Sequence, residues 1–386
     1  MSLPETDPPY MLDKDGQLTV PSITPTDYIE MVVLVFLLLF GLPLNGLVLK
    51  RLIGEWNNGK NSARQKSEGA RSTFLWLKIQ LTLVDLILIL CYCPSKLIWL
   101  ISYQWYYGEC LCKIVQYSWL FSSHLMSFAI VSIAIDRVRT VYRLMHIEKN
   151  GKVPGNSTSQ LVFVKRLIVA SYIASAVLSL PQFYAWILIE SPNFSQCTTI
   201  WHNERALNYV QNPSESSMDV YPLERVYSLF HLLTVFWIPF LMLFFAYLYI
   251  VTYLFWYSLR PYSVSTASPK LIKHSVEMDV DSENLNLWNN RNPSPLPPLP
   301  TVKGTIKTAA GTIPAWRIEM RSKMFNTSIQ VIAAYLVCWM PYNVLALAIF
   351  LHTDVQILIS THAEVLRIFI IFNTVINPFI YGFRPN

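Results

Sequence analysis

The sequence predicts an all-α membrane protein, a bundle of seven transmembrane helices. Its 386 residues are 53% hydrophobic and only 14% charged, whereas soluble domains average about 25% charged residues. The hydrophobic residues also come in long blocks, and the stretch from Met31 to Leu49 contains no charge at all. Crossing about 30 Å of hydrocarbon takes roughly 20 helical residues. Blocks this long and apolar are helices, because backbone groups in lipid need internal partners.

Seven such blocks follow one another along the chain. The predicted helices are 29–52, 74–100, 112–142, 164–189, 226–257, 324–351 and 363–383. They form one membrane domain over 29–383, preceded by a polar, acidic segment, 1–28, and followed by a short tail, 384–386. The first segment lacks the basic start and apolar stretch of a signal peptide, so we expect the first helix to direct insertion. The connection 258–323 is polar and proline-rich, which predicts a long flexible loop.

The distribution of Lys and Arg predicts an extracellular N-terminus. Basic residues gather in the connections 50–73, 137–166 and 258–323. The segments on the other side of the membrane contain only Lys14, Arg205 and Arg225. Connections rich in Lys and Arg stay cytoplasmic, so we expect a multi-pass protein of the plasma membrane with segment 1–28 outside. The net charge of +6 then describes cytoplasmic loops, and no nucleic-acid partner is needed to explain it.

Four polar residues inside the predicted helices are candidates for function, because polar groups in lipid are costly. They are Asn45, Asp85, Asn373 and Asn377. Buried polar groups need partners, so we expect these four to form one network between helices. Such a network either holds the helices together or takes part in a conformational switch, and the residues alone leave both readings open.

Asp136 and Arg137 stand at the cytoplasmic end of the third predicted helix. As neighbours they can pair with each other, and breaking the pair would free Arg137 for a partner from the cytosol. The alternative is an ordinary charged helix end. Prolines recur within the predicted helices, and each frees a carbonyl and bends its helix. Trp339 lies just before Pro341, so a bulky ring sits beside a bend that can act as a lever between two states.

The cysteines predict a disulfide on the outer side. Cys110 and Cys112 lie at the outer start of the third predicted helix, and Cys197 lies in the outer connection between the fourth and fifth. The oxidising exterior permits a bridge, but spacing alone does not choose between Cys110 and Cys112 as the partner of Cys197. The remaining cysteines fall inside helices and are read as packing residues.

No catalytic motif, glycine-rich phosphate loop or metal-binding histidine pattern occurs, so we predict no enzyme, no cofactor and no metal site. A seven-helix transporter is the alternative from another functional class. Transporters tend to show glycine-rich broken helices and repeated halves, whereas this chain has 12 Gly and no internal repeat. The pattern therefore favours a signalling protein over a transporter.

The motifs together resemble the rhodopsin-type (class A) G-protein-coupled receptors over about residues 28–383. The resemblance is carried by Asn45, Asp85, Cys112, Asp136-Arg137-Val138, Pro239 with Tyr247, Cys338-Trp339-Met340-Pro341-Tyr342 and Asn377-Pro378-Phe379-Ile380-Tyr381. It implies an intracellular heterotrimeric G protein as partner. It also implies roles in activation or G-protein coupling for Asp85, Asp136, Arg137, Met145, Pro239, Tyr247, Trp339, Pro341, Asn377, Pro378 and Tyr381. A retinal receptor of this family would need a lysine at the position of Ile371, which argues against that branch.

Shorter segments resemble the gonadotropin-releasing hormone and adipokinetic hormone receptor branch, and the chain is similar to an invertebrate member. These segments are Gln104 to Glu109, Leu111-Cys112-Lys113, Leu180-Pro181-Gln182, Phe194 to Cys197 and Val337 to Tyr342. The resemblance implies that Cys112 pairs with Cys197. It implies an extracellular neuropeptide as agonist and a G protein that drives phospholipase C and calcium release. A different neuropeptide, vasopressin- or oxytocin-like, is the runner-up within the family.

The same resemblance implies an outward-facing ligand pocket. Its lining would be Lys96, Trp99, Gln116, Trp119, Tyr342 and Arg367. The aromatic members have packing as their alternative reading, whereas each cation needs an anion or water, and Glu364 is one turn from Arg367. A basic pocket suits a peptide with an acidic residue. In vertebrate hormone receptors an acid occupies the position of Lys96 and a lysine that of Trp119, so the ligand charges are not preserved.

Other departures concern the transducing end. Tyr335 replaces the usual phenylalanine one turn before Trp339, and Arg321 stands where some receptors carry a glutamate that locks Arg137. No such lock is expected, so the resting state should depend mainly on the pair of Asp136 with Arg137. Met126 stands where a serine often helps to bind sodium, which argues against a sodium site.

One glycosylation site is predicted. Asn193-Phe194-Ser195 is an N-x-Ser sequon in an outer connection, so we expect a glycan on Asn193. Asn156 and Asn326 also stand in sequons, but the predicted topology places both on the cytoplasmic side.

Overall fold

The computed structural model describes residues 11–12, 18–19, 25–60, 69–150, 157–191, 194–211, 221–259, 323–351 and 356–382. The chain forms two compact units. The first, Met1–Val251 with Ala315–Asn386, contains the helix bundle. The second is Thr252–Pro314, of which the end of α9 is described. Most of the predicted loop 258–323, most of the segment 1–28 and the whole tail 384–386 lie outside the described residues.

The bundle confirms the predicted seven-helix architecture. Its spans in chain order are α1 (Pro25–Phe36) with a π-helical turn (Leu37–Gly41) and α2 (Leu42–Lys60); α3 (Gly69–Ser102); α4 (Gly108–Asn150); α5 (Ser157–Leu178); α8 (Pro222–Leu232) with a π-helical turn (Leu233–Trp237) and α9 (Ile238–Leu259); α11 (Lys323–Leu351); and α12 (Gln356–Tyr381). Among the described residues, six helical spans are long and apolar enough to cross a membrane. The seventh, α12, contributes a shorter apolar stretch, Leu366–Tyr381.

The fourth predicted helix ends earlier than the sequence indicated. It was expected to run to 189, but α5 ends at Leu178 and only a short turn, α6 (Gln182–Ala185), follows. Pro181 has no N–H for the helix ladder and its ring clashes with the preceding turn, which explains the break. Residues Trp186–Ser191 form strand β3 instead, because aromatic and β-branched residues suit a strand that has a partner.

Both π-helical turns lie next to a proline. Leu37–Gly41 is followed by Pro43, and Leu233–Trp237 is followed by Pro239. A proline leaves the carbonyl four residues earlier without its amide donor. A wider turn that inserts one residue is a known way for a helix to absorb that loss. At these two prolines the predicted bend therefore takes the form of a short π-helical turn within an α-helix.

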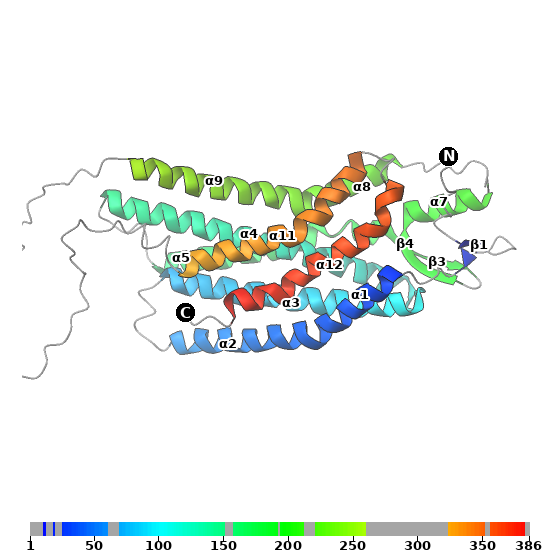
Figure 1. Ribbon diagram of the computed structural model, residues 1–386, viewed down its shortest axis with the longest axis horizontal. Helices are drawn as coiled ribbons and strands as arrows, with labels where there is room; N and C mark the ends of the chain where they lie inside the picture. Colours follow the sequence, from blue (N-terminus) through cyan, green and yellow to red (C-terminus); the bar gives the residue numbers. More distant parts are fainter. Residues whose placement is uncertain are drawn as a thin grey trace, which may run out of the picture. The chain divides into compact units, whose positions relative to one another are not determined.

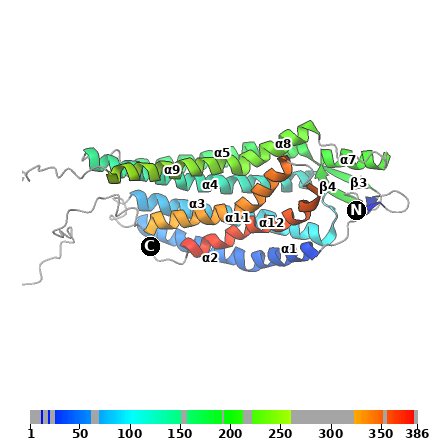
Figure 2. The ribbon, with the colours of Figure 1, turned by 45° about the horizontal axis from the view of Figure 1, so that its top comes forward.

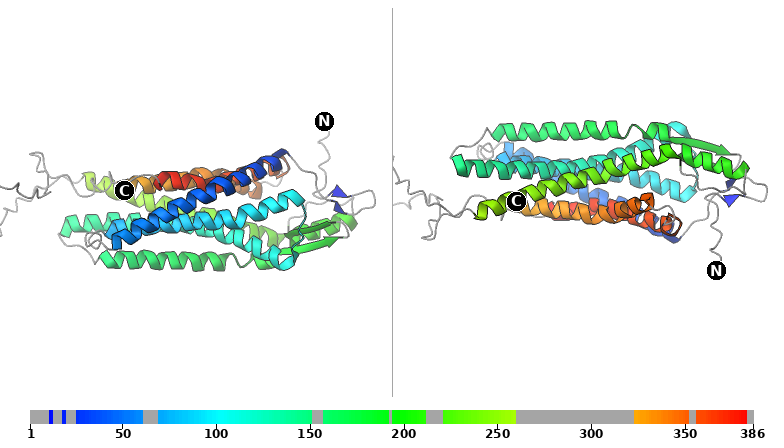
Figure 3. Two further views of the ribbon diagram at one scale, coloured as in Figure 1. Left: turned by 90° about the horizontal axis from the view of Figure 1, so that it is seen from below. Right: turned by 90° about the horizontal axis from the view of Figure 1, so that it is seen from above.

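Figures 1 and 2 show strands β3 (Trp186–Ser191) and β4 (Phe194–Thr199) and helix α7 (Ile200–Gln211) together at one end of the bundle. We call this the hairpin end. Figure 3 shows α11 and α12 on one side of the bundle and α5 on the other. A small antiparallel pair, β1 (Met11–Leu12) with β2 (Leu18–Thr19), precedes α1.

One apolar core runs through the bundle and contains buried residues from α1, α2, α3, α4, α5, α9, α11 and α12. Its largest fully buried side chains include Trp339, Tyr335 and Phe236. Apolar side chains on the outside of the same helices are exposed, such as Val32, Phe245 and Val337. A helix that is apolar on its outer face is typical of a lipid-facing surface.

Candidate functional site

The hairpin end is held to α4 by a disulfide. Cys112 and Cys197 are bonded, with their Cα atoms 5.7 Å apart, and both are buried. Cys197 stands opposite Leu188 in the antiparallel ladder of β3 and β4, so the bridge fixes the whole hairpin. Cys110 is exposed and is not part of the bridge. The structure thus confirms the pairing implied by the family resemblance and resolves the alternative that spacing left open.

A second contact ties the hairpin to the turn after α3. The backbone N–H of Trp105 donates to the carbonyl of Ser195 at 2.8 Å, and the Ser195 hydroxyl donates to the Trp105 carbonyl at 2.8 Å. The Trp105 ring packs with the disulfide in a small separate core. The hairpin is therefore a fixed part of this end of the bundle.

Lys96 is held by an acid from the first span. Its ammonium lies 3.7 Å from the carboxylate of Glu30 in α1, and both residues are buried, at 6% and 3% exposure. The Tyr92 hydroxyl donates to the same carboxylate at 3.4 Å. The ammonium also lies 4.4 Å from the centre of the Trp99 ring. Sequence reasoning missed Glu30, because the approach of α1 to α3 is set by tertiary packing.

Trp99 continues this chain of contacts to the hairpin. Its indole N–H donates to the side-chain carbonyl of Gln196 at 2.7 Å, and that oxygen also accepts from the backbone N–H of Cys197 at 3.1 Å. Gln116 makes a weak contact from α4, with its amide nitrogen 4.0 Å from the Cys197 sulfur. Three of the predicted ligand residues, Lys96, Trp99 and Gln116, thus meet around the base of the hairpin.

The other predicted ligand residues divide into two places. Trp119 donates its indole N–H to the Ser95 hydroxyl at 2.9 Å and packs on Tyr92 at 4.9 Å between ring centres, so it joins α4 to α3. Arg367 of α12 donates to the Tyr342 hydroxyl of α11 at 3.3 Å and lies 5.5 Å from its ring centre. The side chain of Glu364, the anion considered for Arg367, lies outside the described residues.

Helix α7 forms part of the hairpin end and was not predicted. Arg205 forms a two-pronged ion pair with Glu224 of α8, with nitrogen–oxygen distances of 2.5 and 2.9 Å. The rings of Trp201 and Tyr227 pack 5.1 Å apart between the same two helices. Burial lowers the pKa of His202 to about 4, with a smaller contribution from the charge of Arg205. His202 is therefore a neutral side chain at neutral pH.

The polar residues inside the bundle form one bonded pair rather than the single four-residue network expected. The Asn377 amide nitrogen donates to both oxygens of Asp85 at 3.1 and 3.2 Å. Asn45 instead donates to the carbonyls of Gly41 at 2.9 Å and Thr374 at 3.0 Å. Asn373 lies with its amide nitrogen 3.9 Å from the sulfur of Met126, which fills the space beside it. Backbone and sulfur partners, which sequence patterns do not reveal, account for the difference.

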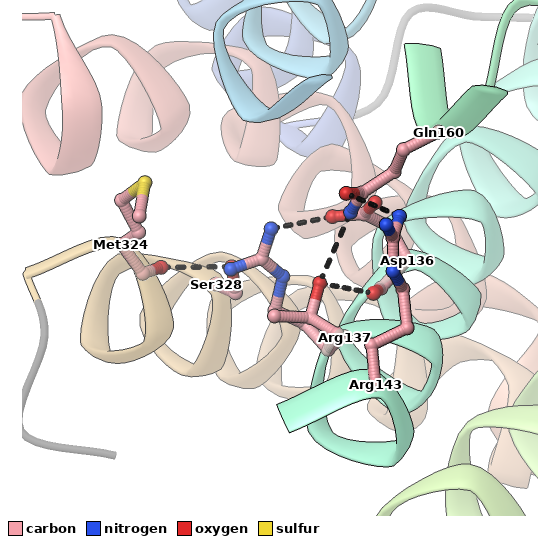
Figure 4. Close-up of polar contacts among 7 residues, drawn as sticks. Asp136, Arg137, Arg143, Gln160, Met324 and Ser328 are labelled. Carbon is pink, nitrogen blue, oxygen red and sulfur yellow. Dashed lines mark hydrogen bonds and ion pairs between the residues drawn. The ribbon is translucent and has the colours of Figure 1, made fainter. Parts of the chain in front are cut away.

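At the other end of α4, Asp136 and Arg137 form an ion pair with each other, and neither side chain is exposed. The Thr140 hydroxyl donates to the Asp136 carbonyl at 2.8 Å. Arg143 donates to the Gln160 side chain of α5 at 2.9 Å, and Gln160 in turn donates to Thr140 at 3.4 Å. Figure 4 draws this network, together with the bond from the Ser328 hydroxyl to the Met324 carbonyl within α11.

A ring from α3 covers the guanidinium of this pair. The centre of the Phe74 ring lies 4.9 Å from the Arg137 guanidinium carbon. Sequence reasoning missed Phe74, Arg143 and Gln160, because none of them belongs to a recognisable motif. The Arg137 end of the bundle thus contains a buried charge pair.

Comparison with known proteins decides the family. The model of the 7 transmembrane receptor (rhodopsin family) matches residues 62–381. The chain belongs to this family. It is therefore a receptor rather than an enzyme, and a multi-pass protein of the plasma membrane.

Two curated relatives of this receptor align with nearly all of it, and a third aligns with about half. The G-protein coupled receptor daf-38 of Caenorhabditis elegans is 28% identical over 96% of this chain and 92% of its own. The Gonadotropin-releasing hormone receptor of Cavia porcellus is 26% identical over 95% of this chain and 92% of its own. The Gonadotropin-releasing hormone receptor of Homo sapiens is 32% identical over 47% of this chain and 53% of its own.

Trp339, the ring of the lever predicted in the sixth span of the receptor, lies in the bundle core. Trp339 is almost fully buried and its ring lies 5.1 Å from that of Tyr335. Pro341 follows two residues later within α11. Asn343 donates to the Trp339 carbonyl at 2.8 Å, so a side chain bridges the backbone across this proline. Pro378 also lies inside its helix, α12, and Pro239 lies at the start of α9 just after the π-helical turn.

Two tyrosines of the receptor do not meet Arg137 in this arrangement. The family resemblance implies a role in activation for both. The Tyr381 hydroxyl lies 3.1 Å from that of Thr82 on α3, and Tyr381 is buried. The Tyr247 hydroxyl has no hydrogen-bond partner among the described residues. Neither hydroxyl is hydrogen-bonded to Arg137 in this structure.

Three predicted features of the receptor lie beyond what the structure describes. Met145 is in α4, but its side chain is outside the described residues. The same holds for Arg321 and for the glycosylation candidate Asn193. Their proposed roles remain predictions.

Proposed function

We propose that this receptor binds a short neuropeptide of the gonadotropin-releasing hormone or adipokinetic hormone type at its hairpin end. We further propose that it activates a heterotrimeric G protein at its Arg137 end. The observation that carries the proposal is the separation of two built sites along one helix. The roughly 25 residues from Cys112 to Arg137 span about 38 Å of α4. One site is rigid and disulfide-bound; the other is a buried charge pair.

The ligand class follows from the character of the hairpin end. The proposed pocket residues are Lys96, Trp99, Gln116, Trp119, Tyr342 and Arg367. Aromatic rings with amide and guanidinium donors between them are suited to a peptide, because they offer apolar contact area and backbone hydrogen bonds together. Lys96 is neutralised by Glu30, so a peptide acid that reaches Lys96 competes with that carboxylate. The relatives whose names contain gonadotropin-releasing hormone support this ligand class.

The transduction step is a movement of α11. An agonist activates only by binding the active arrangement better than the resting one. Tilting of α11 about Pro341, with Trp339 beneath the pocket, opens a cleft beside Arg137. A helix of the G protein then packs there, with Met145 on its rim. Tyr247 and Tyr381 hold Arg137 extended, directly or through water. We expect the phospholipase C and calcium pathway as the output.

The test is a calcium assay in cells that express the receptor, challenged with a neuropeptide library. A response to gonadotropin-releasing hormone or adipokinetic hormone peptides supports the proposal, and its loss in Arg137→Ala assigns the signal to this receptor. Response only to vasopressin- or oxytocin-like peptides would move the receptor to the runner-up ligand class. Substrate uptake without any G-protein response would favour the transporter alternative.

A further inference from the structure

Two buried hydroxyls join three helices at the proline bend of the fifth span. The hydroxyl oxygens of Ser127 on α4 and Tyr335 on α11 are 2.9 Å apart. The Ser127 hydroxyl also lies 2.6 Å from the carbonyl oxygen of Val235, within the π-helical turn between α8 and α9. Ser127 and Tyr335 are both fully buried. We call these three groups the hydroxyl latch.

The position of Pro239 explains why the latch uses the Val235 carbonyl. In a regular helix this carbonyl would accept from the amide of the residue four positions later. That residue is Pro239, which has no N–H. Ser127 thus offers a donor to a carbonyl that the proline cannot serve. His124, one helical turn before Ser127 on α4, lies 3.0 Å from the hydroxyl of Thr234, which belongs to the same π-helical turn as Val235. Helix α4 therefore contacts this bend at two points.

The protons of the latch can be assigned by counting donors. A serine hydroxyl has one hydrogen and can accept as well. The Val235 carbonyl at 2.6 Å and the Ser123 carbonyl at 3.2 Å are acceptors only, so Ser127 uses its one hydrogen on these carbonyls, of which Val235 is the nearer. Ser127 must then accept from Tyr335, whose hydroxyl is the donor. The bond between α4 and α11 therefore exists only because position 335 carries a tyrosine and not a phenylalanine.

We propose that the Tyr335 hydroxyl is a positioning group that holds α11 in the resting arrangement by bonding to α4 at the proline bend of the fifth span. This inference rests on the proposed movement of α11. Tyr335 lies on the part of α11 that leads from Pro341 toward the Arg137 end, and an outward tilt of that part carries it away from α4. A hydrogen bond of 2.9 Å tolerates a lengthening of only a few tenths of an ångström. The tilt therefore breaks the latch.

The latch also restrains α11, for which the sequence offers no acidic partner of Arg137 at position 321. The position of Arg321 lacks a glutamate that would lock Arg137 to α11. The hydroxyl latch ties α11 to α4 in the middle of the bundle instead. It is independent of the Asp136–Arg137 pair, because the two share no atom.

The test is Tyr335→Phe, measured without ligand as basal G-protein activation and normalised to receptor at the cell surface. The variant keeps the ring and leaves the Ser127–Val235 bond intact, so we expect it to fold. We expect the resting-to-active equilibrium to shift toward the active state about 5-fold, the factor that corresponds to about 1 kcal/mol for one hydrogen bond. Ser127→Ala breaks the same bond from α4 and should act in the same direction. In the double variant the two effects should not add.

The matched control is Tyr172→Phe. The Tyr172 hydroxyl donates to the Gln80 side chain at 3.4 Å and joins α5 to α3, two helices that need not separate. Its removal should leave basal activation unchanged. Basal activation equal to wild type in both Tyr335→Phe and Ser127→Ala would overturn the proposal and leave Tyr335 as a packing residue.

A second measurement separates the latch from the proposed G-protein coupling. Spin labels at cysteines introduced for the exposed Tyr142 on α4 and Asn326 on α11 report the distance between these helices in purified receptor, with the exposed Cys110 replaced by serine. We expect Tyr335→Phe to raise the population of the longer distance. If the wild type activates no G protein, the proposed function fails, but the distance change still supports the latch. Identical distance distributions would reject the latch even in a receptor that signals.

Discussion

The carboxylate of Glu30 lies 3.7 Å from the ammonium of Lys96, and both residues are almost completely buried. The pair links α1 to α3 beside the proposed peptide site. Lys96 therefore has a structural role, as the partner of Glu30, in addition to its proposed contact with the ligand. Its ammonium also lies 4.4 Å from the centre of the Trp99 ring, whose indole N–H donates to Gln196 of the hairpin.

This pair predicts an asymmetric mutational result. Removing one partner of a buried ion pair leaves an uncompensated charge and costs about 3–5 kcal/mol, whereas replacing both by apolar residues is often neutral. Glu30→Leu should therefore lower the thermal stability of the solubilised receptor strongly, and Glu30→Leu with Lys96→Met should restore it. The measurement is the unfolding temperature in detergent.

The exposed pair of Glu109 with Lys113, 2.6 Å apart and one turn from each other, is the control. An exposed pair at this spacing contributes about 0.3–0.5 kcal/mol, so Lys113→Ala should change stability little. A Glu30→Leu receptor as stable as wild type would mean that the buried pair does not hold α1 to α3.

The sequence predicted the seven helices because long apolar blocks and their charged connections depend on composition alone. The pair of Asp136 with Arg137 was predicted because the two are neighbours at a helix end, and the bridge of Cys112 with Cys197 because of the family resemblance. Glu30 was missed as the partner of Lys96, because a contact between α1 and α3 depends on helix packing. Strand β3 was mistaken for the end of a helix, because an apolar run from Trp186 onward fits either structure until a partner strand is known.

The disulfide predicts a difference between neighbouring cysteines. Cys112→Ala and Cys197→Ala each release the hairpin, and loss of a native disulfide typically costs about 2–5 kcal/mol in small domains. We expect both variants to lose surface delivery or peptide binding. Cys110→Ala should retain both, because Cys110 is exposed and unbridged. Peptide mapping that found Cys110 linked to Cys197 would contradict the structure.

The docking of α7 is expected to weaken in acid. Burial lowers the pKa of His202 to about 4, whereas an unfolded histidine titrates near pH 6.5. Between these values the undocked state binds a proton that the docked state does not, so stability falls as pH falls from about 6.5 toward 4. Hydrogen exchange of the α7 amides, corrected for its intrinsic pH dependence, should therefore be faster relative to the rest of the receptor at pH 5.5 than at pH 7.

The variant His202→Gln isolates this effect, because glutamine stays neutral over the whole interval. It should remove most of the difference in α7 exchange between pH 7 and pH 5.5. His146→Gln, a histidine on α4 near the Arg137 end, should leave the difference unchanged. Equal pH dependence in wild type and His202→Gln would assign the loosening to another group.

The buried pair of Asp136 with Arg137 predicts opposite effects for its two members. Asp136→Asn removes the charge that holds Arg137 against α4, so basal G-protein activation should rise. Arg137→Ala removes the group proposed to meet the G protein, so ligand-induced calcium release should be lost while peptide binding at the cell surface remains measurable. As a control, Arg166→Ala, which changes an exposed arginine of α5, should signal as wild type.

Asp136→Asn and Arg137→Ala act at one pair but on different states, since Asp136 stabilises the resting receptor and Arg137 is used in the active one. An Arg137→Ala receptor with a normal calcium response would contradict the proposed coupling site. An Asp136→Asn receptor with the basal activation of wild type would show that the resting state depends on other contacts, the hydroxyl latch among them.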